Sequence, residues 1–558
     1  MTTPFGRPFE QPRLQSIVST LVLEPSLGFD VSHVAQNLPL GATPNSDNFI
    51  MREGRLEPRP TLSLLTDALG NATTNLFGIA YATPVTGGME LVDVNEQRYV
   101  LVSFSASSLG AKVLHFLPGL ASVWQTANAA NQTGWSLGPA DYWDWAQAYY
   151  DALDDNVALG VPTGRQGMFV WEPNATSFST LTGAPGATCL AVYDHYVLAG
   201  NVQDGGQTYL QRVMWSDRGS ISSWTGGLSG FDDLLGARGG INRIIALDNR
   251  VAVFFDDEIW VGAPVDFPST FRFVPFDSTL GCPYPWTVAN TPKGPMFMAR
   301  NFQLYLLPKE GGSPMPIGQP IHRSIRDSIV QAPKAHGVYD GVRDIYQFNY
   351  SSGGSGNLPH NAVWLDLNTG AWAPQSYSSG TGVNEDIALT RGFQANLPSS
   401  RGSTWNDYST ASIAWDDESR TWDDMLGIGS ERQSVLYGTS SGSVVYLNSR
   451  GTSDLSRPVM SVWETKKLGD EWPGQQKTVT KVQLDYTAAS NSTLTVRTLR
   501  NGAFSTGTRM QLPAASAGSQ GEAYPYESNR YAAVRFESEG QRDISLERVF
   551  VTMRVGGR

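Results

Sequence analysis

The sequence has little charge, two cysteines and no long apolar run. Charged residues make up 16% of its 558 residues. Cys189 and Cys282 are too few for a disulfide scaffold or a cysteine-based zinc site, and the sequence leaves open whether they pair. No segment approaches ~18 uninterrupted apolar residues, so we expect no membrane anchor. Residues 1–20 lack an apolar core after a basic start, so we expect no secretory signal.

Runs of basic residues are also missing. The chain has 40 Lys and Arg residues against 52 Asp and Glu residues, which gives a formal net charge of -12. A protein that grips nucleic acid through its phosphates normally presents a basic face. We therefore expect no tight binding of DNA.

The patterns of common catalytic sites are absent or misplaced. The stretch Gly438–Gly442 reads Gly-Thr-Ser-Ser-Gly and matches a serine-nucleophile pattern. Apolar strands on both sides predict a hairpin turn around Ser440, whereas that pattern requires a strand, a turn and a helix. The six histidines are far apart and form no metal-binding pair; they are His33, His115, His195, His322, His336 and His360.

Acidic clusters could supply a glycosidase carboxylate pair or a cation site. They are Asp232–Asp233, Asp256–Asp257, Asp416–Glu418 and Asp423–Asp424. Most fall at predicted turns, where solvated acids are common, and no spacing selects a pair. We therefore predict no catalytic residue, no metal site, no cofactor and no enzyme activity.

Turn-forming and aromatic residues are abundant. The chain has 57 Gly, 33 Pro, 16 Trp and 21 Tyr residues. Gly and Pro without a period mark turns, and large aromatic residues suit pleated surfaces. This composition predicts an all-β protein. Only residues 141–153 and 321–330 are fair candidates for helices.

A turn phrase that ends in an aromatic residue returns at intervals of about fifty residues. The closing aromatic residues are Trp124, Phe178, Trp224, Phe271, Trp372 and Trp422, and one double interval leaves room for a further unit near Met315. Four short strands at this period are typical of propeller blades. We predict a β-propeller of six or seven four-stranded antiparallel blades over residues 80–449, preceded by an N-terminal arm with lead-in strands at 1–79.

The phrase at residues 215–224 is the clearest blade signature. Its key residues are Trp215, Ser216, Asp217, Gly219 and Trp224, and it is similar to the Asp-box that sialidases carry on their blade turns. An Asp carboxylate can satisfy the turn backbone while an indole packs against the sheet. We interpret the phrase as a structural marker of the fold.

The C-terminal part has a different pattern. Long strands over residues 477–502 and 530–555 alternate apolar and polar residues, which predicts a small β-sandwich or jelly-roll-like module. We place this module at residues 455–558.

The N-terminal part carries a second signature. It consists of Asn48, Phe49, Gly54, Arg59 and Pro60. Together with the phrases at 215–224, 280–307 and 338–372, in this order, it resembles the propeller-bearing tail nozzle, tail tubular and packaged-DNA-stabilising hub proteins of short-tailed (podovirus-type) phages.

This resemblance implies a virion structural protein of the tail. In that family a ring of copies, usually six, lies below the portal and adaptor and forms the exit channel of the genome. It leads us to expect a homo-oligomeric ring, a hexamer, with portal, adaptor and tail fibre or needle proteins as partners. Genomic DNA would pass without tight binding, and assembly would take place in the host cytoplasm.

Two other functions stay open. One is a carbohydrate-active propeller, either a lectin or a sialidase-like glycosidase, and the other is a scaffold propeller that binds peptides. Assembly state separates them, because a conduit forms rings whereas a sialidase works alone and cleaves a chromogenic sialoside.

Overall fold

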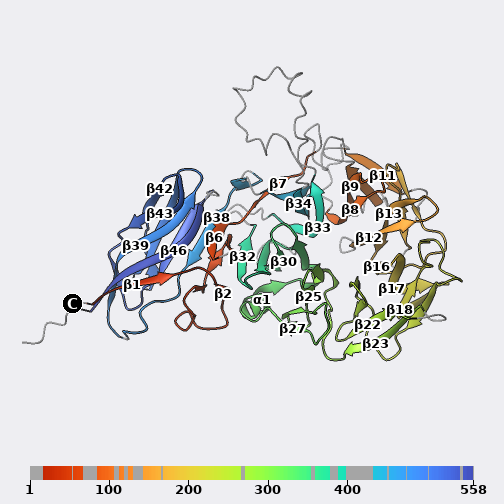
Figure 1. Ribbon diagram of the computed structural model, residues 1–558, viewed down its shortest axis with the longest axis horizontal. Coiled ribbons are helices and arrows are strands. Elements are labelled where there is room, and N and C mark those ends of the chain that lie inside the picture. Colours follow the sequence, from red (N-terminus) through yellow and green to blue (C-terminus); the bar gives the residue numbers. More distant parts are fainter. Residues whose placement is uncertain are drawn as a thin grey trace, which may run out of the picture. The chain divides into compact units, whose positions relative to one another are not determined.

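The computed structural model contains two β-rich units (Figure 1). The propeller unit comprises residues 60–368 and 375–457, and the sandwich unit comprises residues 1–59, 369–374 and 458–558. The structure describes residues 17–52, 54–66, 84–105, 112–117, 124–129, 142–164, 167–265, 270–353, 358–377, 387–397, 432–448, 451–455, 457–472, 474–500, 502–540 and 544–556.

The strands of the propeller unit form seven blades around a common centre (Figure 1). Blade 1 consists of β8 (Val85–Val92), β9 (Arg98–Ser105), β10 (Lys112–Leu117) and β11 (Gln125–Ala129), and blade 2 of β12 (Trp143–Tyr150), β13 (Asp155–Pro162), β14 (Phe169–Trp171) and β15 (Ser177–Thr180). Blade 3 consists of β16 (Cys189–Tyr193), β17 (Tyr196–Asp204), β18 (Gln207–Trp215) and β19 (Gly230–Asp233), and blade 4 of β20 (Arg243–Ala246), β21 (Val251–Phe254), β22 (Ile259–Pro264) and β23 (Phe271–Asp277). Blade 5 consists of β24 (Ala289–Thr291), β25 (Gly294–Met298), β26 (Leu304–Leu306) and β27 (Met315–Pro316). Blade 6 consists of β29 (His336–Asp340), β30 (Ile345–Ser352), β31 (Asn361–Asp366) and β32 (Trp372–Ser376), and β28 (Ile329–Val330) also pairs with β30. Blade 7 consists of β33 (Leu389–Leu397), β34 (Arg432–Thr439), β35 (Val444–Asn448) and β7 (Thr61–Leu64). The predicted all-β propeller fold is confirmed.

The ring closes through a strand from the start of the chain. β7 pairs antiparallel with β35, so residues 61–64 supply the outermost strand of blade 7. The innermost strand of blade 7, β33, contacts β8 of blade 1. Leu62 of β7 is fully buried, and the fourth strand of the last blade thus comes from the N-terminal part of the sequence.

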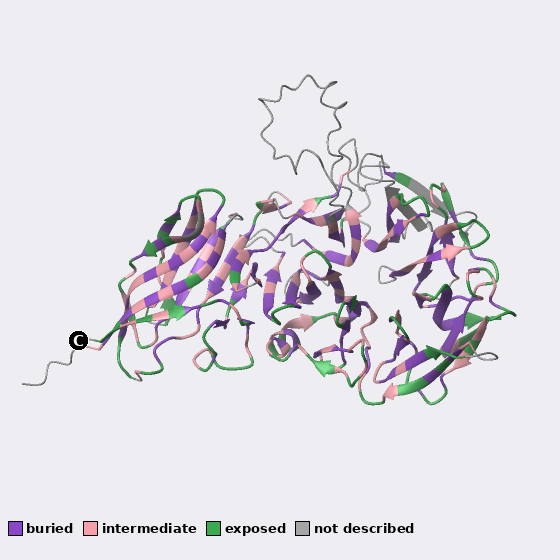
Figure 2. Ribbon diagram, viewed as in Figure 1, coloured by how far each residue is buried: buried purple, intermediate pink, exposed green. Residues whose placement is uncertain are grey.

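The faces of neighbouring blades bury apolar side chains against each other (Figure 2). Four of the recurrent aromatic residues take part in this packing, namely Trp124, Phe178, Trp224 and Phe271. Trp372 is also buried, at the start of β32. The double interval before Trp372 corresponds to blade 5, which ends in β27. Trp422 lies outside the described residues.

One of the two predicted helices is wrong. Residues 143–150 form the innermost strand β12 of blade 2, which pairs along its length with β13. A short isolated helix is marginal in water, and tertiary pairing decides the structure of such a segment. The other candidate contains helix α1 (His322–Ser328), and short 3₁₀ turns occur at η2 (Pro285–Thr287) and η3 (Ala332–Lys334).

The sandwich unit has two sheets that share one apolar core. The first sheet contains β43 (Ala515–Ala523), β39 (Lys477–Ala488), β46 (Ile544–Val555), β6 (Arg55–Pro58) and β5 (Phe49–Arg52). In this sheet β1 (Ile17–Leu23) also pairs with β46, and β44 (Glu527–Asn529) with β39. The second sheet contains β4 (Ser46–Asp47), β38 (Met460–Glu464), β45 (Val534–Glu539), β40 (Ser492–Arg500), β41 (Ala503–Phe504) and β42 (Thr508–Leu512). A minor pair of this unit is β2 (Gly28–Phe29) with β3 (Ala42–Thr43). Another minor pair, β36 (Ser453–Asp454) with β37 (Arg457–Pro458), lies where the chain leaves the propeller unit. Burial alternates along β39 and β46, as the period of two in the sequence predicts (Figure 2).

Residues 1–79, expected as an arm with lead-in strands, contribute strands to both units. β1, β5 and β6 join the first sheet of the sandwich unit, and β7 completes blade 7. The chain passes between the units at four places: Arg59–Pro60, Asn368–Thr369, Pro374–Gln375 and Arg457–Pro458. Within the described residues, no helix has the length and apolar character needed to cross a membrane.

Candidate functional site

The residues of the blade signature form a turn after β18 that side-chain hydrogen bonds hold in place. Ser216 is buried, and its Oγ accepts a hydrogen bond from the backbone N–H of Val197 at 3.0 Å. Oδ1 of Asp217 accepts from the backbone N–H groups of Arg218 and Leu228, at 2.9 and 3.0 Å. Gly219 has a φ of 76°, which a residue with a side chain adopts at a cost. The polar part of the signature therefore satisfies its own backbone.

The two signature tryptophans lie on opposite faces of blade 3. Trp215 packs in the apolar cluster that blade 3 shares with blade 4, with its ring 5.3 Å from that of Phe271, and Trp224 packs in the cluster that blade 3 shares with blade 2. Each indole N–H donates to a backbone carbonyl, at 3.0 and 2.8 Å. Only 5% and 4% of their surfaces are exposed, which leaves no aromatic face for a ligand.

The N-terminal signature is also a packing arrangement. Asn48 has a φ of 59°, and its Oδ1 accepts a hydrogen bond from Nε of Arg59 at 2.8 Å, with both side chains buried. Phe49 lies in the core of the sandwich unit, and Gly54 forms the turn between β5 and β6 with a φ of 75°. Pro60 is buried and begins the propeller unit.

The centre of the propeller unit holds a polar group of side chains that we name the axial cluster. Its members are Tyr142, Asp144, Arg243, Trp286 and Arg391. Tyr142 and Asp144 stand at the start of β12 in blade 2, Arg243 begins β20 in blade 4, Trp286 lies in η2 just before blade 5, and Arg391 is near the start of β33 in blade 7. Side chains from blades that are not neighbours can meet only near the axis of a propeller, so the cluster lies there.

Contacts across the axis join these residues. Nη1 of Arg243 lies 2.6 Å from Oδ2 of Asp144, which also accepts a hydrogen bond from the backbone N–H of Leu190 at 2.9 Å. The guanidinium of Arg391 lies 3.8 Å from the centre of the Trp286 ring, and that of Arg243 lies 5.3 Å from it. The rings of Tyr142 and Trp286 meet edge to face at 5.6 Å.

The cluster has an excess of positive charge. Burial, and then the nearby Arg243, lower the pKa of Arg391 to about 9. Burial raises the pKa of Tyr142 to about 12, and the charge of Arg391 opposes this rise. Burial, and then Arg391, lower the pKa of the nearby His336 to about 3, so this imidazole is neutral near neutral pH. Two guanidinium groups therefore face one carboxylate.

Some donors of the cluster have no protein acceptor among the described residues. Nε of Arg243 and Nη1 of Arg391 are buried and make no hydrogen bond. A buried donor without an acceptor costs roughly 1–3 kcal/mol. An anionic ligand with two oxygen atoms would remove this cost and balance the charge.

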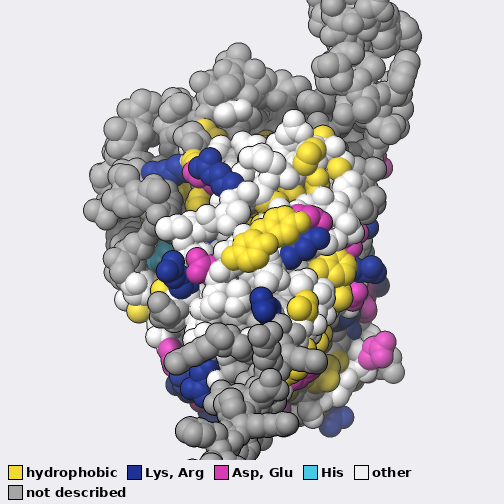
Figure 3. Space-filling view, turned by 90° about the vertical axis from the view of Figure 1, so that its left-hand side faces the viewer, with side chains coloured by type: hydrophobic (Ala, Val, Ile, Leu, Met, Phe, Trp, Pro, Cys, Tyr) yellow, Lys and Arg dark blue, Asp and Glu magenta, His cyan; other side chains and the backbone are white. Residues whose placement is uncertain are grey.

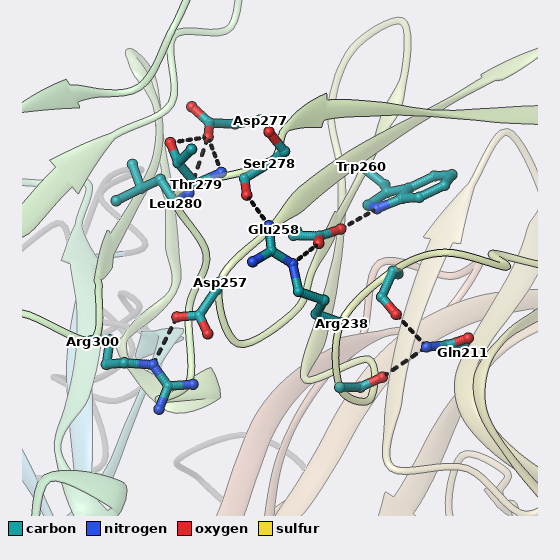
Figure 4. A network of polar contacts seen from close by, with 12 residues as sticks. Gln211, Arg238, Asp257, Glu258, Trp260, Asp277, Ser278, Thr279, Leu280 and Arg300 are labelled. Atoms are coloured by element: carbon teal, nitrogen blue, oxygen red, sulfur yellow. Dashed lines mark hydrogen bonds and ion pairs between the residues drawn. The ribbon is translucent and has the colours of Figure 1, made fainter.

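The predicted acidic clusters are engaged in ion pairs and turns. Nε and Nη2 of Arg212 each donate a hydrogen bond of 2.7 Å to one carboxylate oxygen of Asp233, and this contact lowers the pKa of Asp233. Asp257 accepts a hydrogen bond from Nε of Arg300 at 2.7 Å (Figure 4). The clusters at 416–418 and 423–424 lie outside the described residues.

A buried carboxylate next to Asp257 was not singled out in the sequence. Glu258 accepts from Nε of Arg238 at 2.8 Å and from the indole N–H of Trp260 at 3.1 Å, while Nη2 of Arg238 donates to the carbonyl of Ser278 at 2.7 Å (Figure 4). Its oxygens are thus held within the protein, as expected of a structural ion pair.

Other sequence candidates also prove to be local structure. Ser440 lies in the turn between β34 and β35, as predicted. Cys189 and Cys282 are both buried and unpaired. Within the described ranges, no group of three or more His, Cys, Asp and Glu side chains could hold a metal ion.

Solved structures with a similar arrangement of strands include carbohydrate-cleaving enzymes. An exo-β-1,3-galactanase from Phanerochaete chrysosporium aligns over 88% of this chain and 99% of its own, with 9% identity and a TM-score of 0.27. A glycoside hydrolase family 43 arabinoxylan arabinofuranohydrolase from Bacillus subtilis aligns over 89% and 99%, with 10% identity and a TM-score of 0.23. A fungal alcohol oxidase of the AA5 family in complex with copper aligns over 87% and 91%, with 9% identity and a TM-score of 0.27. No family model and no curated protein match the sequence.

These findings correct the functional interpretation of the sequence. The predicted likeness to phage tail nozzle proteins is wrong, because the similar structures named above are two glycoside hydrolases and an oxidase. The virion role in the tail followed from that likeness, and the assignment as a non-enzyme followed from the missing catalytic motifs; the same comparison contradicts both. At these low identities and TM-scores, the similar structures supply neither a substrate nor a catalytic residue.

The hexameric ring, the portal, adaptor and fibre or needle proteins and the passing DNA stay predictions that a single chain does not test. Their basis was the resemblance that the comparisons overturn.

The axial cluster was missed in the sequence because its members are far apart and follow no motif. Asp144 lies inside the segment that was assigned to a helix, and Arg243 and Arg391 are single arginines in apolar strands. One usable signal was present. A lone charged residue at the start of an innermost blade strand is unusual among buried positions.

Proposed function

We propose that the protein is a carbohydrate-active propeller whose axial cluster binds the acidic residue of a saccharide. The observation that carries the proposal is the meeting of Arg243 and Arg391 with the Trp286 indole at the axis. Guanidinium groups match the planar geometry of a carboxylate, and the buried Trp286 indole holds the Arg391 guanidinium in place by stacking on it.

The charge balance favours an anion over a neutral sugar. Asp144 is bound to Arg243 and neutralises one of the two guanidinium groups, which leaves the charge of Arg391 uncompensated. A carboxylate of the ligand would accept from the free donors of both arginines. Asp144 would then be the carboxylate of the protein nearest to the bound sugar, where an acid or base for glycosidic cleavage acts.

Titration calorimetry with oligogalacturonate and with its methyl ester tests the proposal. The two ligands differ only in the charge of the sugar carboxyl groups, so the free acid should bind and the ester should bind at least about tenfold more weakly, because a hydrogen bond to a charged group contributes roughly 1.5–3 kcal/mol. Arg391→Met should remove the preference, whereas Arg300→Met, which changes an exposed arginine on a blade turn, should keep it.

The same samples test cleavage. Reducing ends released from oligogalacturonate measure hydrolysis, and Asp144→Asn should reduce that release more than it reduces binding. Equal binding of the acid and the ester, or an unchanged affinity of Arg391→Met, contradicts the proposed ligand class.

A further inference from the structure

The sandwich unit presents two exposed tyrosines side by side. Among the aromatic side chains that the structure describes, Phe231, Tyr524 and Tyr526 are exposed, and the last two follow the end of β43 with exposures of 50% and 65%. Their rings lie 6.4 Å apart with planes at 19°. Figure 3 shows an elongated hydrophobic band on the face of the molecule that it displays, with acidic and basic side chains at its margin.

The first ring is held in place by polar contacts. The hydroxyl of Tyr524 donates to Oε2 of Glu522 at 2.5 Å, and Oε1 of Glu522 lies 2.6 Å from Nζ of Lys481. The ammonium group of Lys481 also lies 6.0 Å from the centre of the Tyr524 ring. A ring that is fixed before binding loses little conformational entropy when a ligand stacks on it.

The second ring is held by a strained backbone. Tyr526 has a φ of 51°, which is uncommon for a bulky residue and costs on the order of 1–3 kcal/mol. Most of its side chain is exposed, so burial does not offset this cost. Strain that packing does not explain indicates a function of the side chain.

The surroundings of the two rings suit a neutral ligand that is rich in hydroxyl groups. The charges of Lys481 and Glu522 cancel, and Nε2 of Gln520 donates to Asp485 at 3.2 Å on the same pair of strands, β39 and β43. Side-chain amides and carboxylates of this kind exchange hydrogen bonds with sugar hydroxyls. A nucleic acid could also stack on tyrosines, but the net charge of -12 opposes a polyanion.

We infer that Tyr524 and Tyr526 form a stacking platform for a neutral polysaccharide. The platform lies in the sandwich unit and goes beyond the axial cluster of the propeller unit, which takes a charged sugar. Each ring covers the apolar face of one sugar residue, and the neighbouring polar side chains of β39 and β43 bind its hydroxyls. The two sites would therefore select different parts of a mixed glycan.

Affinity electrophoresis of the full chain through gels containing hydroxyethylcellulose tests the platform. The wild type should be retarded, and Tyr524→Ala should weaken the apparent binding about tenfold. Tyr526→Gly is the sharper variant, because glycine relieves the positive φ and keeps the fold at least as stable while the ring is lost. Phe231→Ala, which removes an aromatic residue of similar exposure in the propeller unit, should migrate like the wild type.

Two outcomes overturn the inference: a wild type that the gel does not retard, or a Tyr526→Gly variant that is folded and retarded as strongly as the wild type. Neither outcome bears on the axial cluster, because binding of oligogalacturonate is measured separately. Conversely, loss of the acid preference in Arg391→Met leaves the retardation by hydroxyethylcellulose unchanged.

Discussion

Replacing Arg391 with methionine separates a binding role from a packing role. The wild-type guanidinium has a buried Nη1 without an acceptor, faces the like charge of Arg243, and stacks on Trp286. Removing an unsatisfied buried donor recovers roughly 1–3 kcal/mol, and the lost cation–π contact costs roughly 0.5–2 kcal/mol. Arg391→Met should therefore raise the free energy of unfolding by about 1 kcal/mol, since methionine fills a similar volume.

Thermal unfolding followed by circular dichroism measures this change, and titration with oligogalacturonate measures binding in parallel. For a unit of this size the midpoint should rise by about 1–2 °C while the affinity for the acid is lost. If the variant is more stable but no longer binds the ligand, Arg391 serves binding and lowers the stability of the wild type. A fall of several degrees would instead show that Arg391 holds the blades together, and the axial binding site would be refuted.

Three further results follow from the same structure. Trp224→Ala should lower the free energy of unfolding by about 3–5 kcal/mol, because the indole is 4% exposed between blades 2 and 3; a melting curve like that of the wild type contradicts the packing role. Binding of oligogalacturonate should be constant near neutral pH and weaken as the pH rises through about 9, because Arg391 loses its charge there; an affinity that is constant across this range excludes Arg391 as the contact. Gly160→Val should destabilise the fold by about 1–3 kcal/mol, since a Cβ at this position would lie 2.5 Å from the Trp145 ring, and chemical denaturation measures this shift.

Local patterns in the sequence were enough to predict the blades. Asp217 accepts hydrogen bonds from the backbone of its own turn region, and the Trp224 indole donates to the carbonyl of Ile221, three residues earlier. Such interactions depend on near neighbours, so their spacing is visible in the sequence. The alternation along β39 likewise reports that one face of the strand is buried.

The segment at 143–150 shows where local patterns fail. Its alanines, glutamine and tyrosines are compatible with a helix, and the sequence alone favoured one. In the structure it pairs with β13, and Trp143 is buried in the cluster between blades 1 and 2. Its strand conformation is thus decided by a partner strand and a neighbouring blade, which outweigh weak helix propensity.

The sequence by itself determined the all-β class, the period of the blades and the sandwich pattern after residue 455, because each depends on spacing along the chain. Only the tertiary structure decided that there are seven blades, that β7 completes the last of them, and that Arg391 and Tyr142 both meet Trp286 at the axis. Those contacts exist only when the ring closes, since closure brings strands from distant blades to one centre. The arginines carry no local pattern for this reason, and their chemistry appears only in the folded ring.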